Sequence, residues 1–206
     1  MILKSKTFLD ESHGREVIEK TSFEDEIIYS DFKKRRTLSI YGEITKQKEF
    51  VFNHMLSQLA KPEKDGSKYP IIIKISSEGG EVNSGLSITS SIISAKKNGY
   101  DVIVEAYGEV MSMAVLPVIV ASVRKCQPYT RFLIHNPLAF MMGYVSAEQF
   151  NRTTKEMNGI LDLYKNVILE HTLVEKEMLE KSFDRDAELI FLGDEAKQLG
   201  FVDELF

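Results

Sequence analysis

Two residues near the middle of the chain, Ser112 and His135, could together perform nucleophilic chemistry. Ser112 lies in the stretch GEVMSMA, after Gly108 and at the expected start of an apolar helix. A helix start offers free backbone N–H groups and the positive end of a dipole. A serine there can present its hydroxyl while the next N–H, that of Met113, faces a developing oxyanion. Taken alone, a serine at this position is more often a helix cap than a nucleophile.

His135 could supply the base that such a serine needs. A serine hydroxyl is not ionised at neutral pH and depends on a neighbouring base. His135 follows the apolar run RFLI and is separated by one residue from a proline, so its ring would be held where it can accept a proton. A purely structural histidine remains the alternative on local grounds. The other histidines are weaker candidates, and no two have a metal-ligand spacing, so no metal site is expected.

A third candidate site is the glycine pair Gly79-Gly80, between an expected strand and an expected helix. Glycines at such a turn let a backbone N–H approach a ligand closely. A phosphate cradle is disfavoured because no Gly-Lys-Ser/Thr pattern follows and because Glu78 and Glu81 would repel phosphate. An oxyanion donor and a plain turn both stay open.

Strands and helices alternate along the sequence that carries these residues. Hydrophobic spacing predicts strands over 37–41, 71–75, 102–104 and 131–134, the third of them ended by Gly108. It predicts helices over 52–59, 82–93, 111–121, 146–171, 175–181 and 194–199. This alternation favours one α/β domain with a largely parallel sheet and helical crossovers. The helix at 146–171 is unusually long, and its apolar stripe is expected to pack on another subunit as well as on its own core.

Composition limits the classes of function. The net charge of −5 disfavours a nucleic-acid partner, which would require clustered Lys and Arg. The longest apolar run, 114–121, is too short to span a bilayer, and the N-terminus lacks a signal-peptide core. Cys126 is the only cysteine, which fits a reducing compartment, and a buried thiol is favoured over a nucleophile. We therefore expect a soluble cytoplasmic protein with no membrane partner.

In their order and spacing, these motifs resemble the proteolytic subunit of the Clp protease family, within the crotonase-like fold. The segments that carry the resemblance are 36–44, 75–80 (ISSEGG), 108–113 (GEVMSM), 134–137 (IHNP) and 195–203. The resemblance implies a crotonase-like α/β domain over 36–206, with a projecting handle helix at about 146–171. Residues 1–35 would form an N-terminal axial segment, expected to be partly mobile.

The resemblance also implies a role for individual residues. Ser112 takes the position of the nucleophile and His135 that of the base, while the N–H groups of Gly80 and Met113 take the oxyanion hole. The family's acid lies in an Arg-Asp pair, so Asp186 is the expected acid, Asp184 is the alternative, and Arg185 becomes a candidate for assembly contacts. One departure from the family motif is Glu78, which replaces the usual proline.

The implied activity is that of a serine endopeptidase of a chambered, ATP-dependent protease, which hydrolyses unfolded polypeptides. The subunits would form a homo-oligomer, a tetradecamer of two stacked heptameric rings. No cofactor is expected, since ATP would be used only by a partner, an AAA+ unfoldase of the Clp type. Lys74 stands where the family usually carries an aromatic residue for docking that partner. The alternatives are a non-catalytic ring subunit that scaffolds an active paralogue, and a crotonase-like enzyme acting on acyl-CoA.

Overall fold

The computed structural model describes residues 7–10, 15–18, 35–136, 144, 146–183 and 188–206. The strands are β1 Thr7–Asp10, β2 Arg15–Ile18, β3 Thr37–Tyr41, β4 Ile71–Ser77, β5 Val102–Met111, β6 Val123–Cys126, β7 Arg131–Ile134, β8 Leu189–Leu192 and β9 Glu204–Leu205. The helical elements are α2 Lys46–Leu59, α3 Val82–Lys97, the 3₁₀ turn η2 Ser112–Ala114, α4 Val115–Ile119, α5 Ala147–His171, α6 Lys176–Ser182 and α7 Gly193–Gln198. The predicted alternation of strands and helices is confirmed, although β6 and β8 were not predicted.

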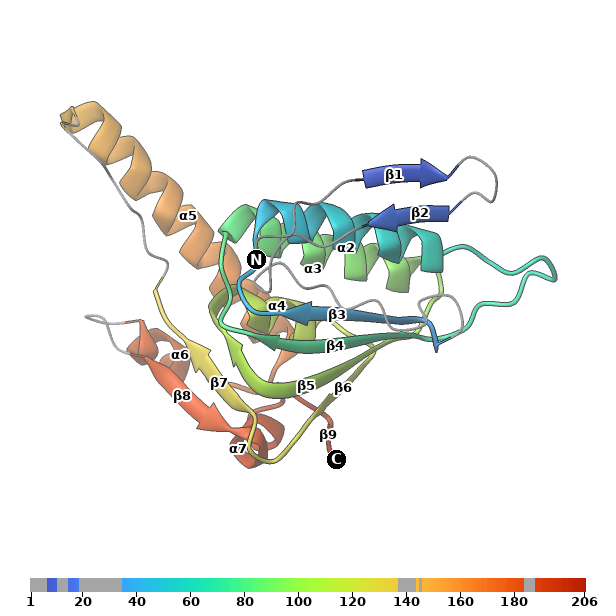
Figure 1. The fold of residues 1–206 in the computed structure, drawn as a ribbon. Helices are drawn as coiled ribbons and strands as arrows, with labels where there is room; N and C mark the ends of the chain where they lie inside the picture. Colours follow the sequence, from blue (N-terminus) through green and yellow to red (C-terminus); the bar gives the residue numbers. More distant parts are fainter. Residues whose placement is uncertain (1–6, 11–14, 19–34, 137–143, 145, 184–187) are drawn as a thin grey trace, which may run out of the picture.

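A seven-stranded sheet forms the centre of the fold (Figure 1). Its main path runs β3-β4-β5-β6-β9 and is parallel throughout, while β7 joins β5 in parallel and β8 joins β7 antiparallel. The predicted, largely parallel sheet is therefore confirmed. A separate antiparallel pair, β1 with β2, forms in a region where no pattern predicted strands.

The strand β5 serves two neighbours along one of its edges. Its residues 103–106 pair with β6, and its residues 109–111 pair with β7, whereas β4 runs along the other edge. The sheet therefore forks close to Gly108, and the two branches separate beyond it. The end of β5 and the end of β7 lie on the same branch.

The prediction that Gly108 ends the third strand was wrong. β5 continues to Met111, and the register against β4 shifts between Ile75, which pairs with Ala106, and Ser77. Gly108 lies inside this irregularity with φ of 54°, a conformation that favours glycine. A glycine within a strand often marks a bulge rather than an end. The bulge lets β5 run on to the turn that holds Ser112.

The hydrophobic core lies mainly between the sheet and the helices α2 and α3, which lie side by side over one face (Figure 1). Alternate residues of β4, namely Ile71, Ile73 and Ile75, are fully buried. Such β-branched residues suit a strand covered on a face by helices. Ile88 and Ile92 of α3 are also fully buried. This core fixes the end of β4, where the glycine pair follows.

The long helix α5 confirms the predicted handle helix. It begins with a capping box between Ser146 and Gln149, and projects away from the sheet (Figure 1). Its buried residues are Tyr164 and Ile168, both in its C-terminal half. Phe150 in its N-terminal half is 56% exposed. Among the described residues, the fully packed positions of α5 therefore all lie in its C-terminal half.

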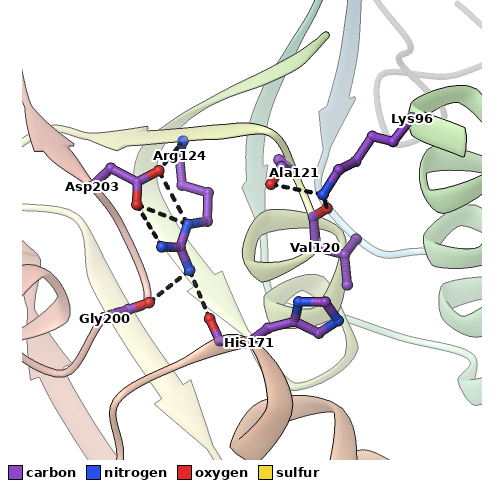
Figure 2. Close-up of polar contacts among 7 residues, drawn as sticks. All are labelled: Lys96, Val120, Ala121, Arg124, His171, Gly200 and Asp203. Atoms are coloured by element: carbon purple, nitrogen blue, oxygen red, sulfur yellow. Dashed lines mark hydrogen bonds and ion pairs between the residues drawn. The ribbon is translucent and has the colours of Figure 1, made fainter. Parts of the chain in front are cut away.

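Arg124 of β6 fastens the C-terminal end of α5 to the sheet (Figure 2). Its guanidinium donates to the carbonyl oxygens of His171 at 2.8 Å and Gly200 at 2.7 Å. It also donates to both carboxylate oxygens of Asp203, which in turn accepts the backbone N–H of Arg124. One side chain thus joins β6, the end of α5 and the chain after α7. The planar guanidinium supplies several donors at fixed angles, which suits it to this role.

Within the described residues, no helix is both long enough and apolar enough to cross a lipid bilayer.

Candidate active site

Ser112 occupies a sharp turn between a strand and a helix. It is the first residue of η2, directly after the last residue of β5, and the preceding Met111 is still extended. The predicted helix start is confirmed, although the helix is divided into η2 and the short α4. Ser112 has φ of 51°, which is uncommon for a residue with a side chain. Backbone strain of this kind persists only where the surroundings hold it, and it is concentrated at functional sites.

Gly79 packs directly against Ser112. A Cβ atom at Gly79 would lie 2.8 Å from the Cβ of Ser112 and 2.7 Å from the carbonyl oxygen of Met111. Gly79 also has φ of 94°. Both the close approach and the conformation therefore require glycine at this position. The backbone of the glycine turn thus lies directly beside Ser112.

The hydrogen bonds around Gly80 leave its own N–H available. Ile44 N–H donates to Gly79 O at 2.6 Å, and Glu81 N–H donates to Ile44 O at 2.9 Å. Ser77 Oγ accepts the N–H of Gly79, which fixes the start of the turn. Among the described residues, no partner accepts the Gly80 N–H. The plain-turn interpretation leaves this group unexplained, whereas an oxyanion donor needs such a group.

The sheet register brings His135 to the same place. Met111 pairs with Leu133 in the parallel pair of β5 and β7. Ser112 follows the first of these residues by one position, and His135 follows the second by two. Both residues are half-buried and line one cavity of about 420 Å³. Within the described residues, however, no hydrogen bond joins the Ser112 hydroxyl to the His135 ring.

The cavity also contains the two predicted oxyanion donors. Gly79, Gly80 and Met113 line it beside Ser112 and His135. The remaining lining residues are Glu43, Glu78, Val82, Ile160 and Tyr164. Four of the predicted site residues, Ser112, His135, Gly80 and Met113, are thus brought together around a single space. This arrangement could accept an acyl group between a hydroxyl, an imidazole and backbone donors.

Tyr164 of α5 makes a polar contact in this site that sequence reasoning missed. Its hydroxyl donates to the carbonyl oxygen of Ser112 at 2.8 Å, and its side chain is buried. Burial raises the pKa of the Tyr164 hydroxyl, so the group keeps its proton and stays a donor. In the sequence, Tyr164 counted only as part of the apolar stripe of the helix. A buried tyrosine usually has a hydrogen-bond partner, and that rule was the available signal.

The predicted acid, its alternative and the assembly candidate lie outside the described residues: Asp186, Asp184 and Arg185. The chain just before them is described, and it is tied to the histidine end of β7. Asn136 Nδ2 donates to the carbonyl oxygen of Phe183 at 2.9 Å. The segment that contains the candidate acids therefore starts from a residue bonded to the neighbour of His135.

Other nucleophiles and metals find no support at this site. Cys126 at the end of β6 is fully buried and does not line the cavity. Burial is the main cause, and the charge of Asp194 the second, of a rise in the pKa of its thiol to about 11. Cys126 is therefore not the reactive thiolate of a cysteine enzyme. Among the side chains that the structure describes, no cluster of three or more His, Cys, Asp or Glu could hold a metal ion.

We compared the sequence and the fold of this chain with those of known proteins. The family model described as Clp protease matches residues 20–206. The chain belongs to the Clp protease family. It is 33% identical over 174 residues to the ATP-dependent Clp protease proteolytic subunit 2 of Borreliella burgdorferi, a match that covers 84% of this chain and 83% of that relative.

A solved structure shows the same family fold. A ClpP1 mutant from Listeria monocytogenes superposes with a TM-score of 0.70 at 29% identity, covering 84% of this chain and 91% of that one. The chain therefore has the ClpP/crotonase-like α/β fold, with a mostly parallel mixed sheet. The predicted family and fold class are both confirmed.

Proposed function

We propose that this Clp-family subunit is a serine endopeptidase with Ser112 as nucleophile and His135 as general base. The observation that carries the proposal is the shared cavity, in which a serine on a strained turn, a histidine and the N–H groups of Gly80 and Met113 meet. A scaffold has no physical need for this combination. Serine nucleophiles, by contrast, need both an adjacent base and preorganised donors.

The reaction would proceed through an acyl-enzyme. Ser112 Oγ attacks the carbonyl carbon of a peptide bond while His135 accepts the hydroxyl proton. The N–H groups of Gly80 and Met113 donate to the oxyanion of the tetrahedral intermediate. His135 then protonates the departing amine, and a water molecule, activated by the same ring, hydrolyses the ester. Asp186 would orient His135 and stabilise its charged form.

The absence of a hydrogen bond between Ser112 and His135 is compatible with this mechanism. Catalytic hydrogen bonds are often long in the free enzyme and tighten when substrate binds. His135 is half-buried and directly follows β7, which fixes the position of its backbone. The same observation would also suit a non-catalytic ring subunit, and direct labelling separates the two functions.

The experiment is labelling of the purified full chain with a fluorophosphonate probe, followed by peptide mapping. We expect one labelled site, Ser112, and no labelling of Ser112→Ala. Cys126→Ala is a matched control, because it removes the competing nucleophile and should leave labelling intact. Labelling that persists in Ser112→Ala would exclude this nucleophile. An assembled wild-type protein that is never labelled and hydrolyses no peptide would point to a scaffold.

We also propose that the subunits assemble into two stacked heptameric rings, in the cytoplasm, and that an AAA+ unfoldase of the Clp type delivers unfolded polypeptides. Family membership and the exposed N-terminal half of α5 support the assembly. At the position proposed to dock the unfoldase, Lys74 Nζ lies 5.9 Å from the centroid of the Tyr107 ring, so the contact there would include a cation. Native mass spectrometry tests the assembly, and a strictly monomeric species would contradict it.

A further inference from the structure

We propose that Tyr164 is a positioning residue for the nucleophile: its hydroxyl holds the carbonyl group of Ser112, so the strained turn keeps the conformation that presents the serine side chain. This inference rests on the proposed function of Ser112. It concerns a residue of the handle helix, α5, that acts on the backbone of the site rather than on the substrate carbonyl.

The carbonyl of Ser112 is held from two directions. Within the helical turn it accepts the N–H of Val115, and from α5 it accepts the hydroxyl of Tyr164 at 2.8 Å. A carbonyl oxygen has two lone pairs, so this one is fully satisfied. The plane of the peptide bond after Ser112 is thereby fixed, and the N–H of Met113 belongs to that same peptide group. The Tyr164 hydroxyl therefore also sets the direction of one proposed oxyanion donor.

The conformation of Ser112 needs such support. Its φ of 51° is unfavourable for a residue with a Cβ atom, and a relaxed turn would change the direction of the side chain. Gly79 leaves little room on one side, because even a Cβ atom added to it would lie 2.8 Å from the Ser112 Cβ. Tyr164 supplies the restraint on the carbonyl side. Gly79 and Tyr164 together restrain the turn at Ser112, from the turn after β4 and from α5.

The Tyr164 ring is itself immobilised. It is 5% exposed and lies edge-on to Phe183, with ring centroids 6.2 Å apart and planes at 88°. Edge-to-face contact is a favoured arrangement for aromatic pairs. The carbonyl of Phe183 accepts the side-chain amide of Asn136, which follows His135. The contacts of Tyr164 therefore reach the nucleophile turn, the histidine strand and the residue before 184.

The test is Tyr164→Phe in the full-length assembled protein, since this change removes only the hydroxyl. We expect kcat for peptide hydrolysis to fall roughly 10- to 100-fold, as small misplacements of reacting groups do, with KM little changed. The rate of fluorophosphonate labelling at Ser112 should fall by a similar factor, while the fraction finally labelled stays the same. The pH profile of kcat/KM should keep its shape, because His135 is untouched.

Tyr100→Phe is a matched control. Tyr100 is buried like Tyr164, but its hydroxyl has no hydrogen-bond partner among the described residues and does not line the cavity. It should be labelled and turn over at the wild-type rate. If Tyr164→Phe behaves like this control, the positioning role is overturned while the proposed function stands. A lower melting temperature with unchanged kcat per labelled site would also overturn it. If wild type itself is not labelled at Ser112, both proposals fall.

Discussion

The side chain of Asn136 donates a 2.9 Å hydrogen bond to the carbonyl oxygen of Phe183, which joins the residue after His135 to the residue before 184. The bond lies just beyond Ile134 and Leu189, the register pair at which β7 ends and β8 begins. One of the two joined segments carries the proposed base, and the other leads into the segment with the candidate acids. We therefore propose that Asn136, a neutral side chain, helps to orient His135 for its role as base.

Removing this hydrogen bond should affect peptide hydrolysis more than it affects the stability of the fold. We expect Asn136→Ala to lower the free energy of unfolding by about 1 kcal/mol, the usual net value of one hydrogen bond. Peptide hydrolysis should fall by a larger factor than that loss implies, because the base would be less well oriented. Urea unfolding and steady-state kinetics measure the two effects. Wild-type kcat/KM in Asn136→Ala would show that the bond does not position His135.

The acid of the proposed triad can be identified by a pair of substitutions. We expect Asp186→Asn to reduce peptide hydrolysis by about 10⁴-fold, the effect of losing the orienting acid in serine proteases. Asp184→Asn is the matched control in the same segment and should retain most activity. The reverse outcome would move the acid assignment to Asp184. Both variants should still bind a noncovalent inhibitor at the site, which a competition assay can check.

The close approach of Gly79 to Ser112 predicts that one added methyl group at Gly79 will strongly reduce stability and labelling. Gly79→Ala must accept both φ of 94° and a Cβ atom 2.8 Å from that of Ser112, so it should be destabilised and poorly labelled by a fluorophosphonate. Gly66→Ala is the control: its φ is 83°, but nothing lies within 4 Å of the added atom. Gly66→Ala should lose only about 1–2 kcal/mol. Equal effects in urea unfolding and labelling would contradict the role of the contact.

The only cysteine offers a simple check on burial. Burial and Asp194 raise the pKa of the Cys126 thiol to about 11. Its thiolate fraction at neutral pH is then more than roughly 100-fold below that of an ordinary cysteine with pKa of about 8.5. We expect a disulfide-exchange reagent to react very slowly with the native protein and rapidly after unfolding in urea. Fast reaction of the native protein would place Cys126 in an accessible site.

Asp203 should make the fold sensitive to acid. Burial raises the pKa of this carboxyl, but the hydrogen bonds and charge of Arg124 outweigh burial and hold it below its ordinary 3.8 (Figure 2). A carboxyl with a lowered pKa stabilises the fold while ionised, and this contribution is lost as the pH falls through that lowered value. Asp203→Asn should therefore be less stable than wild type near neutrality, with the difference shrinking below about pH 4 in urea unfolding. A constant difference down to about pH 3 would contradict this.

The sequence predicted the elements with a strong hydrophobic period. β4 is a run of alternately buried isoleucines, and α5 has both a long stripe and a capping box. β6 was missed because VRKC has two charged residues and no alternation, and it becomes a strand only by pairing with β5. β5 was predicted too short because a glycine in a strand can mark either an end or a bulge. Tertiary pairing decides between these outcomes, and a local pattern does not contain it.

The candidate site was predictable to a similar degree. The order and spacing of three motifs were enough to predict that Ser112, His135 and Gly80 would meet, and one cavity contains all of them. The strain at Ser112 was not predictable, because φ depends on how Gly79 and Tyr164 hold the turn. Tyr164 was hidden because an aromatic residue on a helical stripe is usually core. The acid segment lies outside the described residues, so Asp186 and Asp184 stay predictions.

The fork in the sheet divides the consequences of sequence change along a single strand. Before Gly108, β5 is an ordinary member of a parallel sheet, and a substitution there acts on the stability of the whole domain. Beyond Gly108, residues 109–111 pair β5 with β7, and the two strands lead to Ser112 and His135, the proposed nucleophile and base. Two of these three residues, Val110 and Met111, are buried, so substitutions there would also lower stability. A designer who wished to retune this subunit without risking its folding would begin at Glu109, whose half-exposed side chain is free of core packing.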